Sequence, residues 1–433
     1  MKVASLLLSL LCCAVAHAAE DDGARPVASA LAAAGREQRP LLLDFQAQWC
    51  YSCYFMATHV LTGPQWQAVE KRARVLEVDG DSPDGAAWMQ KLTVKALPSY
   101  VVLKPDGGEL GRIVGEAPRD KFYATIERIL AGSDALDVLK EKAQKGSLDA
   151  TADALESFRA RDEIEPALAW LDALPAAQRA AVDKNPRAAM WHERLRLEQS
   201  RHAHDDAGCR NSASKALAGP LGCDRYYVVE DLLACSEKLP AAERKASLLK
   251  QRPALDDLLA KQVFIAAPAC ADQRSAVMTS ADLDKAIGDP AAEKAVLDHA
   301  IAHAVATLHG DYAADRNLAD NLRVYLNRAG RTAEHDALLT KLIAAFPDDY
   351  VYAYRFGRSL LDRGQPAQAL PYLEQAAQKT FGANRLYVAE ARVKALLELD
   401  RRGEAEQVVA AALEANGPWF PDQAAKLKAM LKS

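Results

Sequence analysis

Residues 44–53 read Asp-Phe-Gln-Ala-Gln-Trp-Cys-Tyr-Ser-Cys, and this stretch decides the fold. It begins inside a short apolar run, 41–46, of the kind found in a central strand, and a helical pattern follows it. Cys50 therefore lies at the start of a helix, where backbone N–H groups favour a thiolate. Cys53 lies close to one helical turn further on and can close a disulfide with Cys50. The pattern indicates a nucleophilic thiol followed by a thiol that resolves its disulfides.

Strand and helix signals alternate on both sides of this stretch. A Pro-Asp-Gly-Gly turn at 105–108 separates the last two strand signals. We expect strands at 41–46, 74–79, 99–103 and 109–114 and helices at 85–92 and 120–130. Residues 19–133 are thus predicted to form one α/β domain.

Two motifs in this domain resemble the thioredoxin family. Residues 44–53 match its Asp-Phe-x-Ala-x-Trp-Cys-x-x-Cys signature, with an aromatic residue lost at Gln46. The segment Ala96-Leu97-Pro98-Ser99 places Pro98 48 positions after Cys50, where the family has its cis-proline. The resemblance implies a thioredoxin-like domain with a central mixed sheet flanked by helices.

The resemblance also implies roles for three residues near the first strand. Cys50 would be the attacking or substrate-linked thiol, and Cys53 would break the mixed disulfide that Cys50 forms. Asp44 would accept the proton of Cys53, directly or through water. A carboxylate is costly to bury, so proton transfer explains Asp44 better than packing does.

Substrate contacts are implied for the residues beside the cysteines. A cis Pro98 would be catalytic by placing the Leu97 backbone against an extended substrate, and Trp49 would cover one side of the sulfurs. Tyr54 follows Cys53 where many members of the family have a cation, and this departure affects the redox poise. Residues 54–66 look most like the C-terminal domain of the membrane thiol-disulfide interchange reductases, which favours a reducing or isomerising role.

The strand signals stop after the α/β domain. From there on, Ala, Leu, Glu, Lys and Arg recur at helical spacing, and prolines interrupt them as between short antiparallel helices. Gly330 and Gly364 begin similar segments 34 positions apart, which resembles the tetratricopeptide repeat. We expect an all-α domain at 134–314 and tetratricopeptide-like helical hairpins at 315–433.

Four further cysteines lie in this helical sequence. An even number of cysteines in an oxidising compartment is usually paired, so we expect structural disulfides here. Because neighbouring helices of a hairpin array meet locally, the expected pairs are sequential, Cys209 with Cys223 and Cys235 with Cys270. A second redox or metal site is the alternative.

No metal or cofactor site is expected from the sequence. The pair Cys50 and Cys53 could be half of a zinc site or a static disulfide, but no second closely spaced pair follows, and neither alternative explains Asp44 or Pro98. The histidines at 202 and 204 fit a polar loop. Those at 299 and 303 fit an ordinary helix face, because the glutamate of a metalloprotease helix is absent.

The N-terminus and the charge balance indicate the compartment. Residues 1–18 combine Lys2, an apolar run and an Ala-His-Ala exit, which predicts a signal peptide cleaved after Ala18. A buried N-terminal helix and a lipid anchor are the alternatives. No later apolar run of the 433 residues would span a bilayer, and a net charge of −5 argues against a nucleic-acid partner. We expect a periplasmic or secreted protein that is not an integral membrane protein.

The resemblance implies disulfide exchange with cysteine-containing client proteins, which the helical repeats would hold. The exchange needs a thiol redox partner, for which a membrane electron donor is one candidate, and no cofactor beyond the redox-active disulfide. Two alternatives stay open. One is a non-enzymatic envelope scaffold that uses the thioredoxin fold for docking, and the other is a reductase dedicated to cytochrome c or metal-centre assembly.

Overall fold

The computed structural model describes residues 25–432, and the expected signal peptide at 1–18 lies outside them. A four-stranded sheet forms the centre of the N-terminal part, in the order β2-β1-β3-β4. Strand β1 pairs parallel with β2 and antiparallel with β3, which pairs antiparallel with β4. The strands are β1 (Leu41–Gln46), β2 (Arg74–Asp79), β3 (Ser99–Leu103) and β4 (Glu109–Val114). Their bounds are those expected from the sequence.

Helices cover both faces of the sheet because successive residues of the buried strands point to opposite sides. Leu41 and Leu43 belong to a core with residues of α1 and α4, whereas Leu42 belongs to a core with residues of α3 and α5. The helices are α1 (Pro26–Glu37), α2 (Tyr51–Phe55), α3 (Gly63–Arg72), α4 (Pro83–Lys91) and α5 (Arg119–Leu130). The expected mixed sheet flanked by helices is confirmed.

Helices make up the remaining chain, and one continuous hydrophobic core runs through them. Their first part contains α6 (Leu136–Gln144), α7 (Leu148–Ala160), α8 (Ile164–Asp172), α9 (Ala176–Val182), α10 (Pro186–His202), α11 (Asp206–Ala216), α12 (Arg225–Cys235), α13 (Ala241–Leu249), α14 (Arg252–Leu258), α15 (Gln273–Ala286) and α16 (Pro290–Leu308). Their second part contains α17 (Arg316–Arg328), α18 (Thr332–Ala345), α19 (Val351–Asp362), α20 (Pro366–Ala377), α21 (Gly382–Glu398), α22 (Arg402–Asn416) and α23 (Pro421–Ala429). Within residues 25–432, none of the helices combines the length and apolar character needed to cross a membrane.

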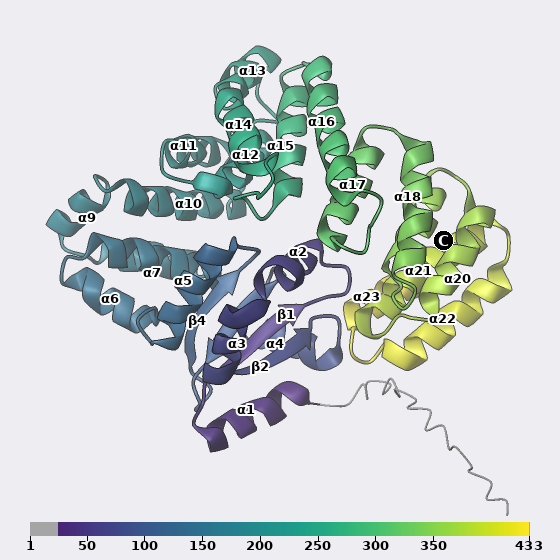
Figure 1. The fold of residues 1–433 in the computed structure, drawn as a ribbon, viewed down its shortest axis with the longest axis horizontal. Coiled ribbons are helices and arrows are strands. Elements are labelled where there is room, and N and C mark those ends of the chain that lie inside the picture. The colour runs from purple at the N-terminus through teal and green to yellow at the C-terminus, as the bar shows by residue number, and fades with distance from the viewer. Residues whose placement is uncertain (1–24, 433) are drawn as a thin grey trace, which may run out of the picture.

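The expected tetratricopeptide-like hairpins are present as the pairs α17–α18, α19–α20 and α21–α22. Gly330 and Gly364 lie between the two helices of their hairpins with φ of 67° and 70°, which is the reason for glycine at both turns. A Cβ atom at Gly357 would lie 2.6 Å from the Leu373 side chain, so the small residue lets α19 and α20 approach. The whole helical region forms an arc around one side of the sheet domain, with α2 on the inner side (Figure 1).

The two disulfides of the helical region differ from the expected pairing. Cys209 is bonded to Cys235 and Cys223 to Cys270, so the sequential pairs are wrong. Helices α11 and α12 form a hairpin, and the start of its first helix meets the end of its second, which brings Cys209 to Cys235. Cys223 lies in a short 3-10 turn (Gly222–Asp224) just before α12, and Cys270 lies just before α15, which packs on α12. Helix packing, rather than distance along the chain, decides both bridges.

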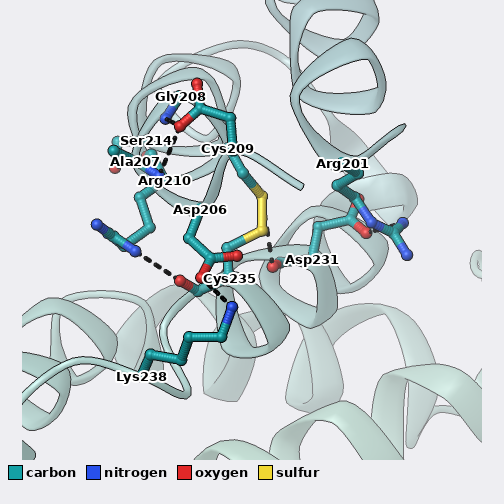
Figure 2. Close-up of a disulfide and its surroundings, with 11 residues drawn as sticks. Arg201, Asp206, Ala207, Gly208, Cys209, Arg210, Ser214, Asp231, Cys235 and Lys238 are labelled. Carbon is teal, nitrogen blue, oxygen red and sulfur yellow. Dashed lines mark hydrogen bonds and ion pairs between the residues drawn. A yellow bond between two sulfur atoms is a disulfide. The ribbon is translucent and has the colours of Figure 1, made fainter. Parts of the chain in front are cut away.

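Polar contacts surround the Cys209–Cys235 disulfide (Figure 2). Arg210 donates to the carbonyl oxygen of Cys235 at 2.7 Å, and Lys238 forms an ion pair with Asp206 at 2.8 Å. Both contacts join the first turns of α11 to the end of α12 and the loop after it. They support the same helix pairing that the disulfide makes covalent.

Replacing Cys223 and Cys270 by serine should lower the stability of the helical region. This bridge closes a loop of 47 residues, and constraining such a loop in the unfolded chain contributes roughly 3–4 kcal/mol. We expect the calorimetric transition of the helical region to move to lower temperature. Cys50→Ser is the control and should leave that transition in place, whereas an unchanged midpoint for the double variant would contradict the prediction.

Candidate functional site

Cys50 and Cys53 form a disulfide at the start of α2, with their Cα atoms 5.2 Å apart. Cys50 is the N-cap of this helix, and the N–H of Cys53 donates to Cys50 Sγ at 3.1 Å. The cap position directs helix N–H groups at this sulfur, as the sequence pattern predicts. Only 3% of Cys50 and 6% of Cys53 is exposed. A reaction partner therefore has little direct access to the pair in this conformation.

Asp44 lies in β1, the strand that precedes the cysteine segment (residues 49–53), and is almost fully buried. Its strand neighbours are Glu77 in β2 and Tyr100 in β3. Burial, and to a smaller extent the carboxylate of Glu77, raise the pKa of Asp44 to about 7. A carboxyl group that titrates near neutrality can accept and return a proton during thiol chemistry.

The Leu97–Pro98 peptide bond is cis, as the resemblance predicts. Leu97 packs against the small cluster formed by Cys50, Cys53 and Ala47. The indole of Trp49 is partly exposed, and its Nε1 donates to Asp81 Oδ2 at 2.8 Å. The cysteine segment (residues 49–53) and the cis-proline segment (residues 96–99) are thus in contact, although they lie far apart in the sequence.

The helical region contributes contacts to this site that the sequence did not predict. Arg355 Nη2 donates to the Trp49 carbonyl oxygen at 3.0 Å, and Asn317 Nδ2 donates to the Tyr51 carbonyl oxygen at 2.8 Å. These partners lie 306 and 266 positions apart in the chain. No local motif marks a contact over such a separation, so only the packing of α17 and α19 reveals it.

A second group of buried polar residues joins the two parts of the chain beside Tyr51. Asp272 Oδ2 accepts hydrogen bonds from the hydroxyls of Tyr227 at 2.7 Å and Tyr51 at 3.4 Å. Glu116, in the loop after β4, lies close to this carboxylate. Desolvation and the negative charge of Asp272 raise the pKa of Glu116, so its protonated form is favoured.

A cavity of about 1070 Å³ opens between the sheet domain and the helical region. The sheet domain lines it with Leu97 and with Tyr51 and Ser52, the two residues between the cysteines. The helical region lines it with residues of α7, α10, α11 and α12, among them Arg194 and Asp231. The cavity therefore leads from the helical arc to the cysteine segment and the cis-proline segment.

Among residues 25–432, no group of three or more His, Cys, Asp or Glu side chains is arranged to hold a metal ion. His299 and His303 lie instead with the ring of Phe264, the first of them stacked on it at 4.3 Å between centroids.

The mixed sheet, the N-capping Cys50 with its bond to Cys53 and the cis bond at Pro98 together define a thioredoxin-like domain with a disulfide at the start of α2. The family described as thioredoxin-like matches residues 24–105. The thiol:disulfide interchange protein DsbD of Neisseria meningitidis is 32% identical over 92 residues, which is 21% of this chain and 15% of that protein. The thiol:disulfide interchange protein TxlA of Synechococcus elongatus is 30% identical over 95 residues, which is 21% of this chain and 47% of that protein.

Among solved structures, the oxidised C-terminal domain of Neisseria meningitidis DsbD is 29% identical to this chain. The match covers 24% of this chain and 92% of that domain, with a TM-score of 0.22. The similarity to DsbD and TxlA thus spans less than half of the length of each of these proteins and 21% of this chain.

Proposed function

We propose that this protein exchanges disulfides with cysteines of client proteins through Cys50 and Cys53, in the periplasm or outside the cell. The observation that carries the proposal is the disulfide at the N-cap of α2, packed against the cis-proline segment at Leu97. The thioredoxin-like family match at residues 24–105 and the similarity to interchange proteins support it. The exchange uses the protein's own disulfide and needs no bound cofactor.

In the reducing direction, the Cys50 thiolate attacks a client disulfide, which forms a mixed disulfide and releases one client thiolate. Cys53 then loses its proton to Asp44 and attacks Cys50 Sγ. This second step releases the other client thiol and leaves the Cys50–Cys53 disulfide, so two electrons pass to the client. A reduced thiol partner must return two electrons before the next cycle.

The cavity between the two parts of the chain suggests where a client segment lies. Its wall contains Ser52 next to the cysteines and Leu97 before the cis-proline, and the helical region forms the opposite wall. A client segment in this cavity would contact both parts of the protein at once. The helical region would then contribute to the choice of client.

Replacing Cys53 by serine should trap clients as mixed disulfides. Without the resolving thiol, the bond between Cys50 and a client cannot be broken from within, so the complex accumulates. The full chain with Cys53→Ser would be expressed in the periplasm of a bacterial host, alkylated and purified under non-reducing conditions. We expect covalent complexes that dithiothreitol releases.

The matched control carries Cys50→Ser in addition to Cys53→Ser, and it should form none of these complexes. Equal capture by both variants would show that the complexes do not depend on Cys50. Absence of cysteine-linked complexes from the single variant would leave the scaffold alternative as the better account.

A further inference from the structure

The positive charges beside the cysteine segment come from side chains of the helical region and not from α2, the helix that contains Cys53. The residue after Cys53 is Tyr54, which is neutral. The guanidinium of Arg274 lies 3.6 Å from the centre of the Tyr51 ring, and Arg355 donates to the carbonyl of Trp49 at 3.0 Å. Both arginines therefore touch residues directly adjacent to Cys50.

One buried carboxylate fixes these two arginines. Asp320 in α17 is completely buried and forms ion pairs with Arg274, Arg323 and Arg355, the first at 2.5 Å. Although burial alone would raise it, these three cations hold the pKa of Asp320 well below its ordinary value. Three guanidiniums around one carboxylate leave a net charge of +2 in a largely buried site. By contrast, the charge of Arg316 on the Tyr54 ring is balanced by Asp349.

Carboxyl groups face the cysteine segment from the other elements around it. Burial is the largest cause that raises the pKa of Asp44, Asp81 and Glu116, and it disfavours their negative charge. Asp272 accepts hydrogen bonds from two tyrosines. The arginines keep their charge over the whole range in which thiols titrate. Because Cys50 is nearly buried, nearby charges act on its thiolate through a low effective dielectric.

We propose that Arg355 and Arg274, held by Asp320, are positioning residues that stabilise the Cys50 thiolate. The helical region thereby completes the redox site by supplying the positive charge that the sheet domain lacks after Cys53. The inference rests on the proposed function for its purpose, since a stabilised thiolate both attacks and leaves more readily at neutral pH.

The test measures the titration of Cys50 without any client. In a Cys53→Ser background, Cys50 is the single thiol within residues 25–432 outside the other two disulfides. Its alkylation by iodoacetamide is followed by mass spectrometry of the peptide that contains it, as a function of pH. Arg355→Gln should move the midpoint upward, so that alkylation at pH 6 becomes about three- to tenfold slower. Arg355→Lys, which keeps the charge, should recover most of that rate.

Arg358→Gln is the matched control in the same helix, because Arg358 donates to Tyr354 and not to the cysteine segment. It should leave the midpoint unchanged. Arg274→Gln is the second variant, which keeps the test valid if Arg355→Gln does not fold, and it should shift the midpoint in the same direction.

Two results would overturn the inference. One is an unchanged midpoint of Cys50 alkylation in arginine variants that fold. This includes the case in which only the alkylation rate at high pH rises, because a looser site exposes Cys50 without changing its titration. The other is a midpoint that Arg355→Lys fails to restore. Neither result depends on a client, so a failure here is distinct from a failure of the proposed function, which would appear as missing mixed disulfides.

Discussion

Replacing Asp44 by asparagine should slow the release of clients from the mixed disulfide by about a hundredfold at pH 8. General acid–base catalysis by a positioned side chain contributes roughly 10²–10⁴-fold, and Asp44 is a buried carboxyl group in the strand that precedes the cysteine segment. The release rate would be measured in a single turnover with a fluorescent disulfide-bonded peptide. In the native protein, the rate should rise as the pH passes about 7, since only the ionised Asp44 accepts the proton of Cys53.

The asparagine variant should lack this inflection. Glu77→Gln provides the control, because Glu77 is exposed and is the smaller cause of the raised pKa of Asp44. We expect this variant to keep the fast rate and to show the inflection at a lower pH. A native rate that does not depend on pH between 6 and 8 would contradict the role of Asp44.

Asp44→Asn should slow the reaction but stabilise the fold. The pKa of Asp44 is raised from 3.8 to about 7, so the folded state holds its proton more tightly than the unfolded chain. The native protein is therefore most favoured below pH 4 with respect to this group, and it loses this stability progressively as the pH rises from about 4 to about 7. One pKa unit corresponds to about 1.4 kcal/mol, so keeping the group buried costs on the order of 4 kcal/mol once the pH is above 7. Asp44→Asn should thus raise the melting temperature most at pH 8, raise it less at pH 5, and have little effect below pH 4.

The local sequence was sufficient to predict the strands and the redox motifs of the sheet domain. The strand bounds follow from short apolar runs between turn residues, and the cysteine and cis-proline positions follow from motifs that are short in sequence. The tetratricopeptide-like hairpins follow from the recurrence of Gly330 and Gly364, because glycine supplies the positive φ that each turn requires.

Contacts between distant segments could not be predicted in the same way. The pairing of Cys209 with Cys235 depends on which ends of α11 and α12 meet, and a rule based on sequence distance chose the wrong partner. Arg274 and Arg355 look like ordinary surface cations in a helical sequence. The helical region curves around the sheet domain (Figure 1). This curvature, which results from the packing of many helices, brings Arg274 to Tyr51 and Arg355 to Trp49.

Asp320 holds this arrangement together, and replacing it by asparagine should be strongly destabilising. The substitution removes the negative charge with which Arg274, Arg323 and Arg355 form ion pairs. It leaves these three cations close to one another. Removing one partner of a buried ion pair typically costs about 3–5 kcal/mol. We expect a lower melting temperature and a weaker hold of α15 and α19 on the cysteine segment.

Asp336→Asn is the matched control, since Asp336 pairs with Arg363 in the same region but both side chains are more than a quarter exposed. It should change the stability by less than about 1 kcal/mol. Adding Arg323→Gln to Asp320→Asn removes one uncompensated cation and should recover part of the loss. The second measurement is the pH midpoint of Cys50 alkylation in the Cys53→Ser background. This midpoint should move upward in Asp320→Asn, because Arg274 and Arg355 lose the carboxylate that holds them beside Trp49 and Tyr51. An unchanged midpoint together with an unchanged melting temperature would contradict the role of Asp320 in holding the helical region against the redox site.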